Sequence, residues 1–148
     1  MSLCTAYFRG EDIYVVASAK NTFGIYNSTE PVFRLTQPVT AEVLGDKILE
    51  ALRAYRENVP GRYYVRGEKN PPDPVLKALG FRSWRALERG ASSFSIESDT
   101  TRVEIVPSVP APKGGFLHQP DQKVRCAPVA GEIGRALLRL FSTTVSPD

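Results

Sequence analysis

The chain has 148 residues, of which 42% are hydrophobic and 24% charged, and its formal net charge is +3. This balance is typical of one globular domain spanning residues 1–148, and it excludes disordered, coiled-coil and collagen-like chains. No apolar run reaches the ~18 residues that a membrane span requires. The first residues, Met1–Tyr7, lack the basic and apolar regions of a secretory signal. The two cysteines, Cys4 and Cys126, indicate reduced thiols, so we expect a cytoplasmic protein.

The first third of the chain has the pattern of strands. Three short runs, Asp12–Ala19, Phe23–Tyr26 and Val32–Leu35, are separated by turn residues and predict a β-meander. From Thr40, a good N-cap, the apolar period becomes helical. The expected buried stripe is Val43, Leu44, Ile48, Leu52 and Tyr55, and the helix should stop near Asn58.

The middle of the chain is less regular. Tyr63–Val65 predicts a short strand, and Asp73 followed by Pro74 predicts a brief helix that ends at Gly80. Ser83 caps a second short helix, Trp84–Arg89. We expect Trp84 to belong to the core rather than to an interface, because it stands next to the cap of a short amphipathic helix.

The last third repeats the order of the first. Ser93–Glu97 and Arg102–Ile105 alternate strictly and predict a hairpin, with its turn at Ser98–Thr101. A loop over Pro107–Pro120, a strand at Lys123–Cys126 and a closing helix follow. The predicted fold class is therefore α+β, with two antiparallel β-meanders, each followed by a long helix, and short helices between them.

The two long helices also resemble each other. Leu44-Gly45, Ile48-Leu49 and Leu52 align with Ile133-Gly134, Leu137-Leu138 and Phe141 at a constant offset of 89 residues. This pattern is expected of an internal duplication. The alternative is that two amphipathic helices with one glycine each look alike by chance.

The sequence offers little catalytic chemistry. His118 is the single histidine and is expected in a solvated loop, and no third residue orients it toward Cys126. Zinc, calcium and phosphate-binding spacings are absent, so we expect no metal and no cofactor. Glu97 and Glu104 should share the outer face of one hairpin, where carboxylates are usually solvated. An enzyme that uses Cys126 and His118 is the least favoured hypothesis.

A second hypothesis is a module that binds single-stranded nucleic acid. It depends on arginines beside aromatic residues, which can hold phosphates and stack bases. These residues are Arg53, Arg56, Arg62, Tyr63, Tyr64, Arg66 and Lys69. The same residue types are favoured at protein interfaces, and the charge excess is smaller than a nucleic-acid footprint.

Several blocks of the sequence resemble one family. Ser83–Ala91 with the hairpin after it, Pro112–Phe116 with Pro120, and Gly131–Leu137 follow in the order seen in immunity proteins of contact-dependent growth inhibition (CDI) systems. The opening strands, including Asn27–Leu35, fit the same order. The resemblance covers nearly the whole chain, and the order of the blocks is more specific than any one of them.

This resemblance implies a cytoplasmic antidote, not an enzyme, that binds the toxic C-terminal domain of a large surface-exposed CDI protein. The toxins of such systems are often nucleases, including ribonucleases, and the antidote usually covers the active site. The family's folds combine antiparallel sheets with helices, and some look like a duplicated single-stranded-DNA-binding architecture. We expect a monomer before toxin binding, with no membrane contact and no direct contact to nucleic acid.

The chain departs from the family in its charge. Antidotes to cationic nucleases are commonly acidic, whereas this chain has a pI near 9.0. Either the toxin is not strongly cationic, or a local acidic patch steers it. Our candidate patch is Glu97, Asp99 and Glu104, and the rival toxin-binding surface is Tyr63, Tyr64 and Arg66.

Overall fold

A computed structural model describes residues 1–61 and 73–144. In chain order the elements are β1 (Ser2–Arg9), β2 (Asp12–Asn21), β3 (Tyr26–Thr36), α1 (Ala41–Arg53), β4 (Arg56–Val59), α2 (Pro74–Leu79), α3 (Trp84–Glu88), β5 (Ala91–Ser98), β6 (Val103–Pro110), β7 (Phe116–His118), the 3₁₀ turn η1 (Pro120–Gln122), β8 (Val124–Cys126) and α4 (Ala130–Thr144). Within the described ranges the strands form one sheet in the order β3-β2-β1-β5-β6-β7, with β4 beside β2 and β8 beside β6.

The sheet joins two meanders through its centre. In the first half, β2 pairs with both β1 and β3, all antiparallel, and α1 follows. In the second half, β6 pairs with β5 on one side and with β7 and β8 on the other, again antiparallel, and α4 follows. β1 and β5 pair antiparallel and connect the halves, while α2 and α3 lie between them in sequence. This arrangement confirms the predicted α+β class of two meanders, each with a long helix.

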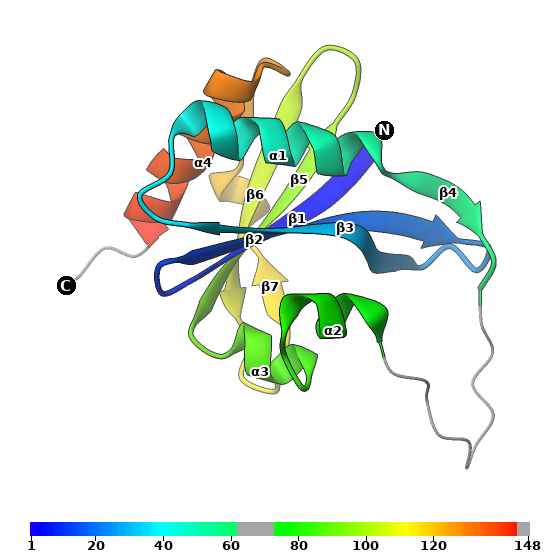
Figure 1. Cartoon of the computed structure of the whole chain (residues 1–148). Helices are drawn as coiled ribbons and strands as arrows, with labels where there is room; N and C mark the ends of the chain where they lie inside the picture. The colour runs from blue at the N-terminus through cyan, green and yellow to red at the C-terminus, as the bar shows by residue number, and fades with distance from the viewer. Residues whose placement is uncertain (62–72, 145–148) are drawn as a thin grey trace.

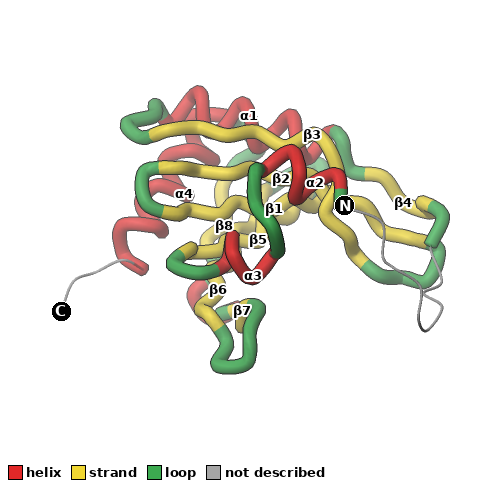
Figure 2. Tube along the Cα trace, turned by 60° about the horizontal axis from the view of Figure 1, so that its bottom comes forward, coloured by secondary structure: helices red, strands yellow, loops and turns green. Residues whose placement is uncertain are grey.

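The two faces of the sheet are covered by different helices. α1 and α4 lie side by side over one face, and α2 and α3 lie under the other (Figures 1 and 2). The larger core lies under α1 and α4, and the strands supply it with Cys4, Ala6, Phe8, Ile13, Val15, Ala17, Phe94, Ile96, Val103 and Ile105. The smaller cluster joins Tyr7, Tyr14 and Val16 to Val75, Leu79 and Leu87. β1 and β2 are therefore buried on both faces.

The helix boundaries follow the predicted caps. The Thr40 hydroxyl accepts from the N–H of Val43 at 3.2 Å, and Asp73 accepts from the N–H of Val75 at 2.9 Å. Gly80 adopts a φ of 83°, the left-handed conformation that favours glycine after a helix. Ser83 accepts from the N–H of Ala86 at 3.1 Å. Local side-chain chemistry thus fixes where these helices begin and end.

Trp84 belongs to the second cluster, as expected of a core residue. It is half-buried, its ring centroid lies 6.3 Å from that of Tyr7, and it packs beside Leu87 and the other residues of that cluster. Its indole N–H donates to Asp73 Oδ2 at 3.0 Å. Asp73 therefore caps α2 and also satisfies the polar end of a packed tryptophan.

The structure corrects several boundaries. The first meander begins with β1, a strand we did not predict. The predicted strand Phe23–Tyr26 lies almost wholly in the turn between β2 and β3, and the turn residues Asn27–Thr29 that follow it are part of β3. The helix α1 ends at Arg53 rather than near Asn58. Val43, expected in the buried stripe, is 44% exposed, because the stripe faces the sheet along Leu44, Ile48 and Leu52.

Of two further expectations, one is wrong in part and the other stays a prediction. The predicted loop Pro107–Pro120 contains the end of β6 and all of β7, joined by a short turn in which Ala111 N–H donates to Gly115 at 2.9 Å. The predicted strand Tyr63–Val65 lies outside the described residues.

The sheet repeats its pairing in the two halves. The pair Cys4–Ala17 in the first hairpin recurs as Phe94–Pro107 in the second, each residue 90 positions further on. At the outer edge, the pair of Val15 with Phe33 corresponds to the pair of Ile105 with Val124. The bulge in β3 occupies the position at which η1 separates β7 from β8 in the second half. The two halves therefore share one pattern of strand register.

α1 and α4 correspond at the predicted offset of 89 residues, because equivalent residues of the two helices make equivalent contacts where they cross. A Cβ atom at Gly45 would overlap the backbone carbonyl of Ala130, and one at Gly134 would overlap that of Ala41. The two contacts are equivalent, since Gly45 and Ala41 lie 89 positions before Gly134 and Ala130. Each helix thus presents a glycine to the backbone of the other, which allows an approach that no larger residue permits.

This crossing predicts that Gly45→Ala and Gly134→Ala each destabilise the protein. Alanine gains ~1 kcal/mol of helix propensity over glycine, but the overlap with backbone forces the helices apart at a cost of about 1–3 kcal/mol or more. Urea unfolding followed by circular dichroism measures the difference.

The matched control is Gly131→Ala at the start of α4. A Cβ there meets only flexible side-chain ends, those of Arg135 at 3.1 Å and Glu42 at 3.4 Å. We expect this variant to be neutral or slightly more stable than the parent chain. Equal effects at positions 131 and 134 would contradict the close crossing.

Candidate partner-binding surfaces

The acidic residues of the second hairpin lie together, as expected. Glu97 on β5 is directly opposite Glu104 on β6, and both stand on the face opposite to Phe94, Ile96, Val103 and Ile105, which are buried under the long helices. Asp99 follows at the start of the hairpin turn. The structure thus brings the three candidate carboxylates to one end of the sheet, and their role as toxin contacts stays a prediction.

Two arginines offset much of this negative charge. Arg125 Nε donates to Glu104 Oε1 at 2.7 Å, and Arg102 Nη2 lies 3.8 Å from the same oxygen. Arg102 Nε also lies 3.8 Å from Asp99 Oδ2. Three carboxylates beside two guanidiniums form a mixed surface rather than a strongly acidic one, which weakens their capacity to steer a cationic partner.

Asp99 has a structural role that the sequence analysis did not assign to it. Its Oδ1 accepts from the backbone N–H groups of Thr101 at 2.7 Å and Arg102 at 2.9 Å, and from the Thr101 hydroxyl at 2.8 Å. These hydrogen bonds favour the carboxylate and lower the pKa of Asp99. An aspartate at the start of a hairpin turn often closes the turn in this way, and that signal was present in the sequence.

The rival toxin-binding residues Tyr63, Tyr64 and Arg66 lie outside the described residues, as do Arg62 and Lys69 of the nucleic-acid hypothesis. Of the remaining two, Arg53 ends α1. Arg56 turns back on the backbone, where its Nη1 donates to the carbonyls of Arg53 at 3.2 Å and Tyr55 at 3.0 Å.

The hypothesis of a Cys126–His118 catalytic pair is wrong. Both residues pair with β6, but His118 stands opposite Ser108 and Cys126 opposite Val103, five residues apart along that strand. At ~3.4 Å per residue this separation is roughly 17 Å, far beyond proton-transfer distance. His118 Nδ1 instead lies 3.0 Å from the hydroxyl of Ser108, its cross-strand neighbour.

No group of three or more His, Cys, Asp or Glu side chains is arranged to hold a metal ion in residues 1–61 and 73–144. In the same ranges, no helix is sufficiently long and apolar to cross a membrane.

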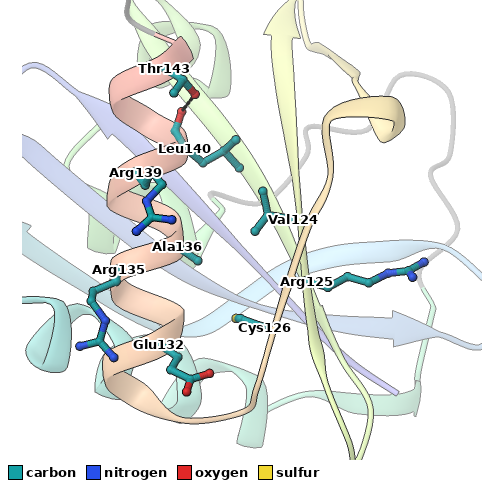
Figure 3. Close-up of a pocket in the computed structure, with 9 residues that line it drawn as sticks. All are labelled: Val124, Arg125, Cys126, Glu132, Arg135, Ala136, Arg139, Leu140 and Thr143. Carbon is teal, nitrogen blue, oxygen red and sulfur yellow. Dashed lines mark hydrogen bonds between the residues drawn. The ribbon is translucent and has the colours of Figure 1, made fainter.

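A groove that the sequence analysis did not identify runs between α4 and β8 (Figure 3). Its volume is about 480 Å³. Val124 and Cys126 point from β8 toward the helix, Ala136 and Leu140 point from the helix toward the strand, and Arg125 points away from the groove. The remaining lining residues are Glu132, Arg135, Arg139 and Thr143, all on α4. The groove therefore has an apolar floor and a charged rim.

Burial raises the pKa of the Cys126 thiol, and the charge of Glu132 adds to the effect. Cys126 is consequently a neutral thiol at physiological pH rather than a thiolate nucleophile. The carboxylate of Glu132 also accepts from the N–H of Ala127 at 3.3 Å, so it holds the turn between β8 and α4. Both groups shape the groove, and neither is activated for chemistry.

Comparison with known proteins gives structural but not sequence relatives. No protein-family model matches the sequence, and no curated protein matches it. A protein of unknown function from Neisseria meningitidis superposes with a TM-score of 0.72 at 18% identity, over 96% of this chain and 94% of that one. A chain of a CdiA-CT/CdiI toxin and immunity complex from Yersinia pseudotuberculosis superposes with a TM-score of 0.67 at 16% identity, over 98% and 97%.

The chain shares their fold. Because each superposition covers nearly the full length of both chains, the likeness includes the two meanders, both long helices and their order. Identities of 18% and 16% show the architecture and do not by themselves transfer a function.

The role of Asp99 in the hairpin gives a prediction about pH. In the folded chain its carboxyl should titrate below the pKa of an unfolded aspartate, about 3.9. Since the folded pKa is the lower one, its contribution to stability is complete above the unfolded value and is lost as the pH falls through the folded value. NMR titration of the carboxyl carbon measures the midpoint, and Thr101→Ala should raise it partway by removing one hydrogen bond. Identical midpoints in folded and urea-unfolded chains would exclude this role.

Proposed function

We propose that this chain is the immunity protein of a contact-dependent growth inhibition system and that it binds and blocks a cognate toxin domain. The observation that carries the proposal is the near full-length fold likeness to a chain of a toxin and immunity complex. The sequence resemblance supports the immunity side of such a pair, because its blocks at Ser83–Ala91, Pro112–Phe116 and Gly131–Leu137 resemble blocks of immunity proteins.

The proposed mechanism is steric. The inhibitor covers the active site of the toxin, which we expect to be a nuclease such as a ribonuclease, and it contributes no reactive group of its own. The arrangement of its two candidate catalytic side chains supports this view, since His118 and Cys126 are far apart along β6. The proposed partner is the C-terminal domain of a large surface-exposed protein, neutralised in the cytoplasm by a monomeric inhibitor.

A complex of this kind would have a standard interface. Such interfaces bury ~800 Å² on each partner and reach nanomolar affinity or better when a few well-packed residues anchor them. The fold offers rigid surfaces for this purpose, because both faces of its central strands are packed. A preorganised inhibitor loses little conformational entropy on binding.

The proposal expects a large toxin gene directly upstream of this chain's gene, and the test is co-expression of this chain with the toxin domain which that gene encodes. Cells that make the toxin alone should stop growing, and cells that also make this chain should grow normally. In vitro, the purified toxin should degrade RNA or DNA, and an equimolar amount of this chain should stop the reaction. Failure to rescue growth with both proteins well expressed would reject the proposal.

The nucleic-acid hypothesis is tested beside it with a labelled single-stranded oligonucleotide. An immunity protein should leave the oligonucleotide unbound at physiological salt. Binding that weakens steeply as salt rises would favour the nucleic-acid module instead.

A further inference from the structure

We infer that the groove between α4 and β8 is the place where the toxin docks, and that it receives an exposed segment bearing carboxylates beside a small apolar side chain. The inference builds on the proposed function, since it assumes a protein partner, and it specifies the surface and the chemistry of that partner. It rests on how the groove arises from the internal repeat, on its charge and on its shape.

The groove lies where the second half of the repeat has smaller side chains than the first at three positions, two on β8 and one on α4. In the first half Phe33 of β3 faces α1, and Lys47 Nζ lies 4.9 Å from the centre of its ring. By strand register Val124 stands in the place of Phe33, and by the helix offset Ala136 stands in the place of Lys47. Likewise Cys126 replaces Leu35. The first half fills this space with its own side chains, and the second half leaves it open.

The charge on the helix beside the groove is also reversed between the halves. Asp46 and Glu50 on α1 correspond to Arg135 and Arg139 on α4 at the same offset of 89 residues. Since Arg125 points away from the groove, its lining has two arginines on α4, Arg135 and Arg139, against one glutamate, Glu132. An excess of guanidinium groups around an apolar floor attracts carboxylates, which they bind in bidentate geometry.

The arginines differ in how far their charge is already used. Arg125 is bound to Glu104, and Arg135 Nη1 lies 3.6 Å from Glu42 of α1. Among the described residues no ion pair involves Arg139, which is exposed on the outer side of α4. Arg139 is therefore the cation with the least compensation and the one that we expect to meet a partner's carboxylate.

The lining favours protein over nucleic acid. Single-stranded nucleic acid is held by aromatic platforms on which bases stack. The floor here is Val124, Ala136 and Leu140, and no aromatic residue lines the groove in the described part of the chain. An aliphatic floor with arginines at its rim suits a small apolar side chain flanked by acidic residues. This chemistry also agrees with a basic inhibitor whose own acidic hairpin is largely paired.

The first test changes the charge at the groove. With the toxin domain encoded beside this chain's gene as the probe, Arg139→Glu should weaken binding about tenfold or more, chiefly through slower association. Arg82→Glu, in the exposed loop between α2 and α3, is the matched control, since it changes the net charge equally on the other side of the sheet, and its affinity should stay within about twofold of the parent. Equal effects of the two variants, or no effect of Arg139→Glu, would overturn the inference.

The second test changes the shape without changing the charge. Val124→Phe restores the side chain that the first half carries at the equivalent position, so the fold has a precedent for it. The variant should unfold in urea near the parent midpoint and bind the toxin at least about tenfold more weakly, because filling the pocket excludes its occupant. A folded Val124→Phe chain with parental affinity would overturn the inference.

Cys126 supplies a readout placed in the groove itself. Cys4 is fully buried, whereas Cys126 is partly exposed, so alkylation by N-ethylmaleimide in the folded chain reports on Cys126. Bound toxin should slow this reaction about tenfold or more, and Cys126→Ala gives the background. Unchanged alkylation in a complex that otherwise forms would place the toxin elsewhere and leave the proposed function intact.

Other occupants give different results in the same assays. If an oligonucleotide rather than the toxin protects Cys126, or if the chain protects itself as its concentration rises, the groove holds nucleic acid or a second copy and the inference fails. If the parent chain does not bind the toxin at all, the proposed function fails, and the inference that rests on it fails with it.

Discussion

The close crossing of α1 and α4 is the contact on which the rest of the structure depends. Gly45 and Gly134 let each helix touch the backbone of the other, so both helices can lie side by side over one face of the sheet. From that position α1 contacts β1, β2 and β3, while α4 contacts β6 and β8. A wider separation would leave the core beneath them underpacked, since interiors tolerate few voids.

The sheet provides the second constraint, because its two halves share one register. The central strands β1 and β5 occupy equivalent places in the two halves, pair with each other, and both contribute to the core under the long helices. The halves differ most at the outer edges. β3 is one long strand with a bulge, whereas β7 and β8 are two short strands separated by η1. The groove lies at this second edge, where fewer packing demands restrict its side chains.

Much of the fold could be predicted from the sequence because its signals are local. Caps at Thr40, Asp73 and Ser83 and the alternation of the second hairpin each act within a few residues. β1 was missed for a physical reason: a strand buried on both faces does not alternate, and Cys4 and Ala6 have little β-propensity. Asn27–Thr29 looked like a turn because its residue types favour turns, yet pairing with β2 overrides that preference.

The candidate site was less accessible to sequence reasoning. Acidic residues on a hairpin are visible in a sequence, but the arginines that pair with Glu104 come from β6's own turn and from β8, and their proximity is a tertiary result. The groove depends on the small side chains of Val124 and Ala136. Small residues at these positions are not informative in the sequence until each is compared with its larger counterpart in the first half, Phe33 or Lys47. The offset between the helices, visible in the sequence, pairs Ala136 with Lys47. The pairing of Val124 with Phe33 follows only from the strand register in the structure.

The contacts that join the two halves are reciprocal. Pairing of β1 with β5, and the crossing of α1 with α4, each make the same contact twice with the two halves exchanged, as Gly45 with Ala130 and Gly134 with Ala41 demonstrate. Surfaces of this kind are self-complementary, which is the defining feature of an isologous two-fold interface. Within this one chain, the two halves are therefore joined by the same geometry that joins the two subunits of a symmetric dimer.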